Sequence, residues 1–125
     1  KRVGADYRAV PRCIFTNPEV AAVGLTEAEL KVKKIAYKKA TVPITVIGRA
    51  NTSDVRDGFV KVLADRKTGV LLGATIASPH AGEMIHELAL AVQNRMRAQQ
   101  VADTIHAFPT WSEAVRVACA KLART

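Results

Sequence analysis

A β-hairpin in the middle of the chain constrains the fold more than any other feature of the sequence. The segment 58–65 carries Val60 and Val62, residues 66–69 end in a glycine, and the segment 70–77 is apolar at nearly every position. Two such runs joined by a short turn predict a pair of antiparallel strands. Because the second run has no polar face to turn toward solvent, we expect it at the centre of a sheet.

Three other segments predict the remaining strands. Residues 13–16 and 20–25 are short apolar runs separated by a turn, and each predicts a short strand. Residues 37–46 are rich in β-branched side chains and predict a longer strand, which Pro43 places at an edge or bends. Residues 48–57 are expected to form a loop.

Two helices are predicted before the C-terminal region. Thr26 and Glu29 form a capping box, and the helix that follows is expected to run to about Lys34. Ser78 and Pro79 predict the start of a long helix, as its cap and its first helical residue. That helix has an apolar stripe at three- and four-residue spacing, made of Ala81, Met84, Ile85, Leu88, Ala89, Val92 and Met96.

A terminal helix completes the predicted architecture. A second capping box, from Thr110 to Glu113, opens this helix. Its predicted buried face consists of Trp111, Val115, Ala118 and Leu122. Taken in order, the elements predict an α+β domain, in which helices pack on an antiparallel sheet of about four to five strands.

Composition narrows the classes of function. A length of 125 residues fits one domain, and 49% hydrophobic with 24% charged residues is a globular composition. No apolar run approaches the roughly 20 residues needed to cross a bilayer, so no membrane partner is expected. The net charge of +8 includes a dense cluster at Lys31–Lys39, but no aromatic residues are interleaved to stack on bases. We therefore interpret this cluster as a solvated surface and expect no nucleic-acid partner.

The cysteines and two of the histidines have simple interpretations. Cys13 and Cys119 lie in apolar surroundings far apart in the sequence, which predicts two buried, reduced thiols and a cytoplasmic protein. No cysteine–histidine run has zinc spacing. His80 and His86 are six residues apart, which places them on different sides of the long helix. No metal site is expected.

The segment 104–113 carries the candidate chemistry. His106 precedes Pro109 on a connection between helices, where functional groups concentrate. Glu113 has two interpretations that do not exclude each other: it accepts the N–H of Thr110 as part of the capping box, or its carboxylate orients an imidazole. The chain has no glycine-rich dinucleotide fingerprint, phosphate-binding loop, serine-nucleophile motif or cysteine pair. The residues alone therefore predict an α+β domain with one candidate loop.

Five segments, taken in order, resemble the C-terminal dimerisation domain of the pyridine nucleotide–disulfide oxidoreductases. They are residues 14–27, 58–65, 68–74, 81–85 and 104–113. This family includes dihydrolipoamide dehydrogenase, glutathione reductase and mercuric reductase, and the resemblance extends from about Val10 to the end of the chain. It implies that residues 1–10 are a linker or arm from an upstream domain and that residues 11–125 are the dimerisation domain. The first residue is not Met, and we expect the chain to be part of a longer protein.

The resemblance implies a function that the chain does not perform alone. Members of the family are homodimeric flavoproteins that carry FAD, use NADH or NADPH, and pass electrons to a small-molecule acceptor. Their FAD and NAD(P) domains and their redox-active cysteines lie upstream of the dimerisation domain. That domain binds a second copy of itself and completes the active site of the partner subunit. By this resemblance, the present chain binds no cofactor alone and is inactive alone.

The candidate loop departs from the family at its central residue. Phe108 stands directly before Pro109, where the members that exchange dithiols have the histidine that serves as acid and base. The resemblance assigns a catalytic role to Glu113, and backbone contacts with the partner's FAD to Phe108 and Pro109. His106 matches the first histidine of the family's His-Ala-His-Pro-Thr form, which is not the base there, and it is a candidate substitute base only if the loop turns its ring inward. Because phenylalanine cannot carry a proton, the substitution favours an acceptor other than a simple disulfide, such as a metal ion, a quinone or another small oxidant. The alternative is a free-standing basic α+β module that binds a partner or associates with itself, without catalysis.

Overall fold

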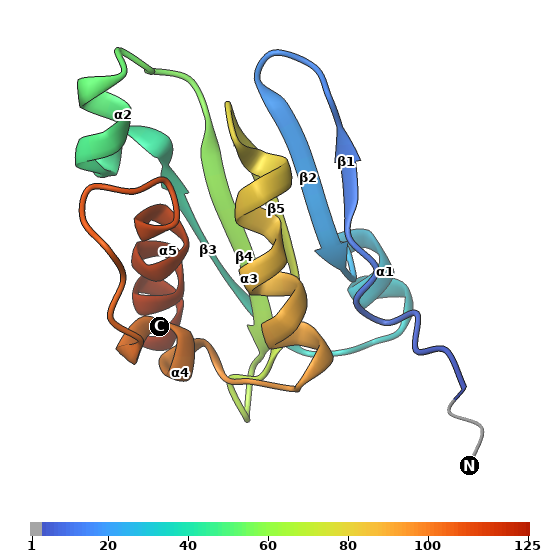
Figure 1. Cartoon of the computed structure of the whole chain (residues 1–125). Helices are drawn as coiled ribbons and strands as arrows, with labels where there is room; N and C mark the ends of the chain where they lie inside the picture. The colour runs from blue at the N-terminus through green and yellow to red at the C-terminus, as the bar shows by residue number, and fades with distance from the viewer. Residues whose placement is uncertain (1–3) are drawn as a thin grey trace.

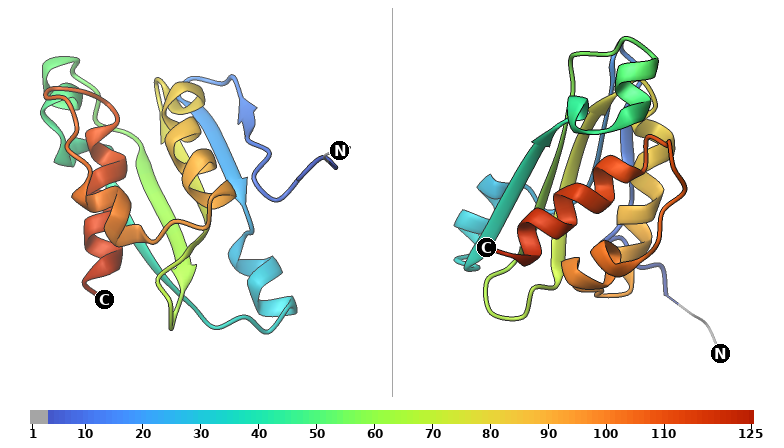
Figure 2. Two further views of the ribbon diagram at one scale, coloured as in Figure 1. Left: turned by 60° about the horizontal axis from the view of Figure 1, so that its bottom comes forward. Right: turned by 90° about the vertical axis from the view of Figure 1, so that its left-hand side faces the viewer.

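The computed structural model describes residues 4–125 as a five-stranded antiparallel sheet with helices on it, in the strand order β1-β2-β5-β4-β3 (Figure 1). The elements in chain order are β1 (Arg12–Ile14), β2 (Glu19–Gly24), α1 (Glu27–Val32), β3 (Tyr37–Pro43), the 3-10 helix η1 (Ile44–Val46), α2 (Gly48–Thr52), β4 (Phe59–Asp65), β5 (Leu71–Ser78), α3 (Ala81–Gln93), α4 (Ala98–Asp103) and α5 (Glu113–Ala123). The predicted α+β class and the antiparallel sheet are confirmed. Helices α3 and α5 cover one face of the sheet, whereas α1 lies toward the other face (Figure 2).

The predicted hairpin is present and its return strand is central. β4 and β5 pair antiparallel, with Val60 opposite Ile76, and β5 also pairs with β2. In the connecting turn, the carboxylate of Asp65 accepts the N–H groups of Lys67 and Thr68 at 2.9 and 2.8 Å. Both hydrogen bonds lower the pKa of the Asp65 carboxyl, and the bond from the Thr68 N–H has the larger effect. The turn is therefore fixed by its own side chains.

The hydrophobic core lies between the sheet and the helices α3 and α5. Buried side chains project from the sheet on this face and meet the apolar stripes of both helices, which bury most of their large residues. The largest fully buried side chains of this core are Ile44, Ile76, Ile85, Leu88, Leu122, Val23, Val60, Val62, Val115 and Cys119, whereas Leu30 of α1 and Leu63 are buried outside it. Because close-packed interiors are stiff, this core gives the connections above it a fixed support.

Helix α1 is held on the open face of the sheet by its first residue. The Glu27 carboxylate accepts hydrogen bonds from Tyr37 Oη at 2.9 Å and from the ammonium groups of Lys39 and Lys61 at 3.2 and 3.4 Å. The Tyr37 bond, followed by the two lysines, lowers the pKa of Glu27, although partial burial opposes the shift. Thr26 caps the helix as predicted, since its hydroxyl accepts the N–H of Glu29 at 3.2 Å.

Pro43 acts in both of the ways that the sequence allowed. It is the last residue of β3, and β3 is an edge strand. The chain then turns into η1, so the segment predicted as a strand to residue 46 ends three residues earlier. The expectation of a plain loop over residues 48–57 is wrong, because Gly48–Thr52 form the short helix α2.

The long helix begins and ends at other residues than predicted. Ser78 is fully buried as the last residue of β5, and the N-cap is His80. The Ser78 hydroxyl accepts the N–H of His80 at 3.4 Å, so it shapes the turn before the helix without capping it. Helix α3 ends at Gln93, which leaves Met96 outside it, and the separate helix α4 was not anticipated.

The two cysteines differ in burial. Both are free thiols, and Cys119 is fully buried in α5, where desolvation raises its pKa to about 12. Cys13 on β1 is only partly buried, which corrects half of the prediction. None of the helices in residues 4–125 combines the length and apolarity needed to cross a membrane. Of the predicted arm 1–10, residues 1–3 lie outside the described part of the chain, and residues 4–10 contain no helix or strand.

Candidate functional site

The candidate loop is the connection from α4 to α5. It arches over the N-terminal end of α5 and comes close to α2, at the end of the domain where α3 also begins (Figure 1). Two large apolar side chains on this loop face solvent: Ile105 is 96% exposed and Phe108 is 78% exposed. Such exposure at an ordered loop is typical of a surface that meets another molecule. These two side chains are thus not packed into the core of their own domain.

Glu113 closes the start of α5. Its Oε2 accepts the N–H of Thr110 at 3.1 Å, which is the back-bond of the predicted capping box. The other half of that box is different, because the Thr110 hydroxyl donates to the carbonyl of Ala107 at 2.7 Å and does not accept an amide. The predicted bond from the Thr110 N–H to Glu113 is therefore present, but Thr110 is not the N-cap: α5 begins at Glu113 with Ser112 as its N-cap, which leaves Trp111 outside the helix and only partly buried.

His106 is turned toward its own domain. Its Nε2 lies 2.6 Å from Oε2 of Glu87 on α3, and its Nδ1 lies 2.7 Å from the carbonyl oxygen of Thr104. The side chain is only 7% exposed, against 30% for Glu87. Both ring nitrogens therefore have a hydrogen-bonding partner within the domain. His106 thus anchors the loop to α3.

Phe108 is exposed on the loop and contacts α2. Its ring edge lies against Gly48 of α2, where a Cβ would stand 3.5 Å from the ring. The peptide bond between Phe108 and Pro109 is cis. Within residues 4–125, neither the Phe108 nor the Pro109 carbonyl accepts a hydrogen bond. The loop therefore offers an aromatic ring and two unused acceptors to a neighbouring molecule.

The predicted site residues lie on the loop and on the first residue of α5, but they do not form one cluster. Glu113 bonds to Thr110 and His106 bonds to Glu87, and no hydrogen bond joins the two in the described chain. Sequence reasoning missed Glu87, which lies 19 residues before His106. The sequence offered only one hint of Glu87, which is a carboxylate beside the apolar stripe of α3. That hint does not identify His106 as the residue that Glu87 contacts. His80 and His86 are exposed, and no group of three potential metal ligands occurs in residues 4–125.

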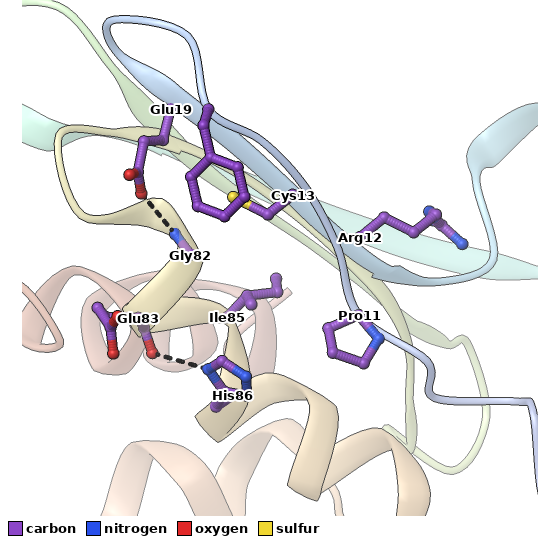
Figure 3. A pocket seen from close by; sticks show the side chains of 9 residues that line it. Pro11, Arg12, Cys13, Glu19, Gly82, Glu83, Ile85 and His86 are labelled. Carbon is purple, nitrogen blue, oxygen red and sulfur yellow. Dashed lines mark hydrogen bonds between the residues drawn. The ribbon is translucent and has the colours of Figure 1, made fainter.

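A second feature of α3 is a cavity of about 280 Å³ between this helix and β1 (Figure 3). The Glu19 carboxylate reaches across it to accept the N–H of Gly82 at 3.0 Å, and the Cys13 thiol lies over the same glycine. Burial, followed by the nearby carboxylates of Glu19 and Glu83, raises the pKa of Cys13. A thiol with a raised pKa is a poor nucleophile, so this cavity is not a candidate for cysteine chemistry.

Comparison with known proteins assigns the fold and the loop to one family. Residues 10–119 match the model of the family described as the pyridine nucleotide-disulphide oxidoreductase dimerisation domain. The chain belongs to this family. The mitochondrial dihydrolipoyl dehydrogenase of Caenorhabditis elegans is 47% identical over 116 residues, which are 93% of this chain and 23% of that protein. A leghemoglobin reductase of Glycine max is 42% identical over 113 residues, which are 90% of this chain and 22% of that protein. The chain thus spans about a quarter of these curated relatives.

Solved structures of the family have the same fold. LpdA from Mycobacterium tuberculosis superposes with a TM-score of 0.90 at 34% identity, covering 96% of this chain and 26% of that one. The Cu(II) complex of the HOCl-induced flavoprotein disulfide reductase RclA from Escherichia coli gives a TM-score of 0.87 at 25% identity, covering 92% and 26%. The family membership predicted from the sequence motifs is thereby confirmed.

Proposed function

We propose that this dimerisation domain pairs two subunits of an FAD- and NAD(P)-dependent oxidoreductase, and that its loop 104–112 completes the active site of the partner subunit. Membership of the dimerisation family supports the pairing. The observation that carries the second part is the outward presentation of Phe108 on a loop that is anchored from below. When bound, FAD takes electrons from the nicotinamide and passes them to the acceptor.

The residues of the loop fit a position beside a flavin. The unused carbonyls of Phe108 and Pro109 can accept a hydrogen bond from an N–H group of the flavin ring. The Phe108 ring can cover the flavin edge and exclude water, which strengthens the electrostatic interactions of a site. Helix α5 and the capping bond of Glu113 hold both residues at the end of a rigid element, as precise positioning requires.

The same geometry disfavours dithiol–disulfide exchange. Phe108 cannot carry a proton, and the two nitrogens of His106 are engaged by Glu87 and Thr104. Use of His106 as a base requires that both hydrogen bonds be broken and that the ring cross to the outer side of the loop. Glu113 then has no imidazole beside it to orient. We therefore propose an acceptor that takes electrons without an imidazole at residue 108: a metal ion, a quinone or another small oxidant.

The names of two relatives are compatible with such a range of acceptors. One is a leghemoglobin reductase, and one solved structure is a Cu(II) complex of a flavoprotein disulfide reductase. We further propose that the isolated chain turns over no substrate, since the electron carriers belong to the other domains of the protein. Its two free thiols suit a reducing compartment, and we propose the cytoplasm.

The test is to change Phe108 in the complete gene product. Phe108→His should raise turnover of dihydrolipoamide or glutathione disulfide if the missing imidazole is what blocks exchange, by about 10² or more. Phe108→Tyr is the matched control, because it keeps the ring but supplies no imidazole. Steady-state rates with disulfides, quinones and metal ions should show that wild type prefers the non-disulfide acceptors. A wild-type enzyme that reduces disulfides efficiently contradicts the proposed acceptor class.

A further inference from the structure

We propose that the cavity between α2, the start of α3 and the start of α5 binds planar aromatic anions. This cavity, named here the Trp111 pocket, has a volume of about 330 Å³ and is lined by Arg49, His80, Glu83, Met84, Thr110, Trp111 and Ser112. It shares Thr110, Trp111 and Ser112 with the candidate loop but does not include Phe108 or His106. The inference goes beyond the proposed function, because it concerns a second ligand site and not the contact with flavin.

Two aromatic rings form one wall of the pocket. The imidazole of His80 and the indole of Trp111 have centroids 5.5 Å apart with their planes inclined by 51°. Rings at this separation and tilt leave part of the indole face uncovered, and Trp111 is only partly buried. Met84 is buried at the base and supplies a polarisable apolar surface. A flat ring can therefore lie against this wall.

Donor groups at the pocket have no partner inside the chain. In the described residues, the guanidinium of Arg49 forms no ion pair, and the indole N–H of Trp111 donates to nothing. Neither group is buried without a partner, so both face solvent or the cavity. Arg49 and Trp111 both line the cavity, and a guanidinium and an N–H donor are groups that recognise a carboxylate or a phosphate.

Two further lining residues add hydrogen-bonding groups to the pocket. The Glu83 carboxylate and the Ser112 hydroxyl also lack hydrogen-bond partners within residues 4–125, and Glu83 accepts only. A ligand that carries a hydroxyl or an amino group in addition to its anionic group can use both the donors and the acceptors of this lining. Hydroxyaryl carboxylates and purine nucleotides share this chemistry, which is a planar ring with an anion at one end and a hydrogen-bond donor at the other.

The single tryptophan of the chain makes this inference directly measurable. The indole N–H of Trp111 gives one cross-peak in a ¹H–¹⁵N spectrum of the 125-residue protein, and it needs no assignment. Titration with 4-hydroxybenzoate and, separately, with AMP should move this peak along a saturating curve, with a dissociation constant of about 1 mM or below for at least one of them. The tighter of the two identifies the source of the ligand.

Variants and matched ligands decide what is recognised. Arg49→Gln should weaken binding by about tenfold, whereas Arg124→Gln, which removes the same charge at the far end of α5, should leave it within about twofold. 4-Hydroxybenzamide, which is neutral, should bind more weakly than 4-hydroxybenzoate. The proposal is overturned by a peak that does not saturate with either anion, by equal binding of the amide, or by an unchanged affinity in Arg49→Gln. None of these outcomes depends on dimerisation or on flavin, so they test the ligand site separately from the proposed function.

Discussion

The hydrogen bond between His106 and Glu87 is predicted to hold the candidate loop, and its contribution can be worked out from the structure. The two atoms are 2.6 Å apart, the His106 side chain is 7% exposed and that of Glu87 is 30% exposed. A hydrogen bond to a charged group contributes about 1.5–3 kcal/mol. Partial exposure of Glu87 lowers this, and we expect about 1–2 kcal/mol. For a chain of this size the loss corresponds to a fall in Tm of roughly 4–8 °C.

A double-mutant cycle measures this contribution. Glu87→Ala, His106→Ala and the double variant are unfolded in urea, with the fluorescence of Trp111 reporting on the start of α5. The coupling free energy should be about 1 kcal/mol or more. The surface pair Gln99 and Asp103 on α4, with Nε2 and Oδ1 2.6 Å apart, is the matched control and should couple by only about 0.2–0.5 kcal/mol. A coupling for His106 and Glu87 no larger than that of the control pair would refute the anchoring role.

Three further predictions concern the framework. Because folding lowers the pKa of Asp65, its carboxylate stabilises the fold fully above the ordinary pKa of 3.8, and this stabilisation is lost as pH falls through the folded-state pKa. Asp65→Asn should therefore make the loss of stability in acid less steep when unfolding is followed by circular dichroism. Equal slopes for the two proteins would contradict this. A Cβ at Gly73 would stand 2.0 Å from the Leu25 carbonyl oxygen, so Gly73→Ala should lower the free energy of unfolding in urea by about 3 kcal/mol or more. At the control position Gly69, φ is 76° and a Cβ would meet no atom within 4 Å, so Gly69→Ala should lower it by only about 1–2 kcal/mol. A thiol reagent should modify Cys13 in the native protein and the fully buried Cys119 only after unfolding, and rapid native labelling of both would show that α5 is not packed as described.

Features that depend on neighbouring residues could be predicted from the sequence. The hairpin of β4 and β5 was predicted because both strands and the turn lie within twenty residues and each has its own signal. The back-bond of Glu113 was predicted for the same reason, since donor and acceptor are three residues apart. The edge position of β3 followed from Pro43, which cannot donate to a further strand.

Features that depend on tertiary packing could not be predicted. Ser78 and Pro79 have the residue types of a helix start, but the sheet extends through Ser78 and buries it, which moves the N-cap to His80. Helix α2 has five residues and begins with glycine, so its sequence gives no helical period. The pair of His106 and Glu87 joins two elements whose approach is set by the core beneath them. The loop was therefore predicted as a site, but its anchor was not.

A crystal structure of the complete gene product with FAD bound tests most directly whether this loop serves a neighbouring subunit. We predict a homodimer in which Phe108 and Pro109 of one subunit lie within about 4 Å of the flavin held by the other. A dimer in which both loops face solvent, or in which each loop contacts the flavin of its own subunit, would contradict the proposal.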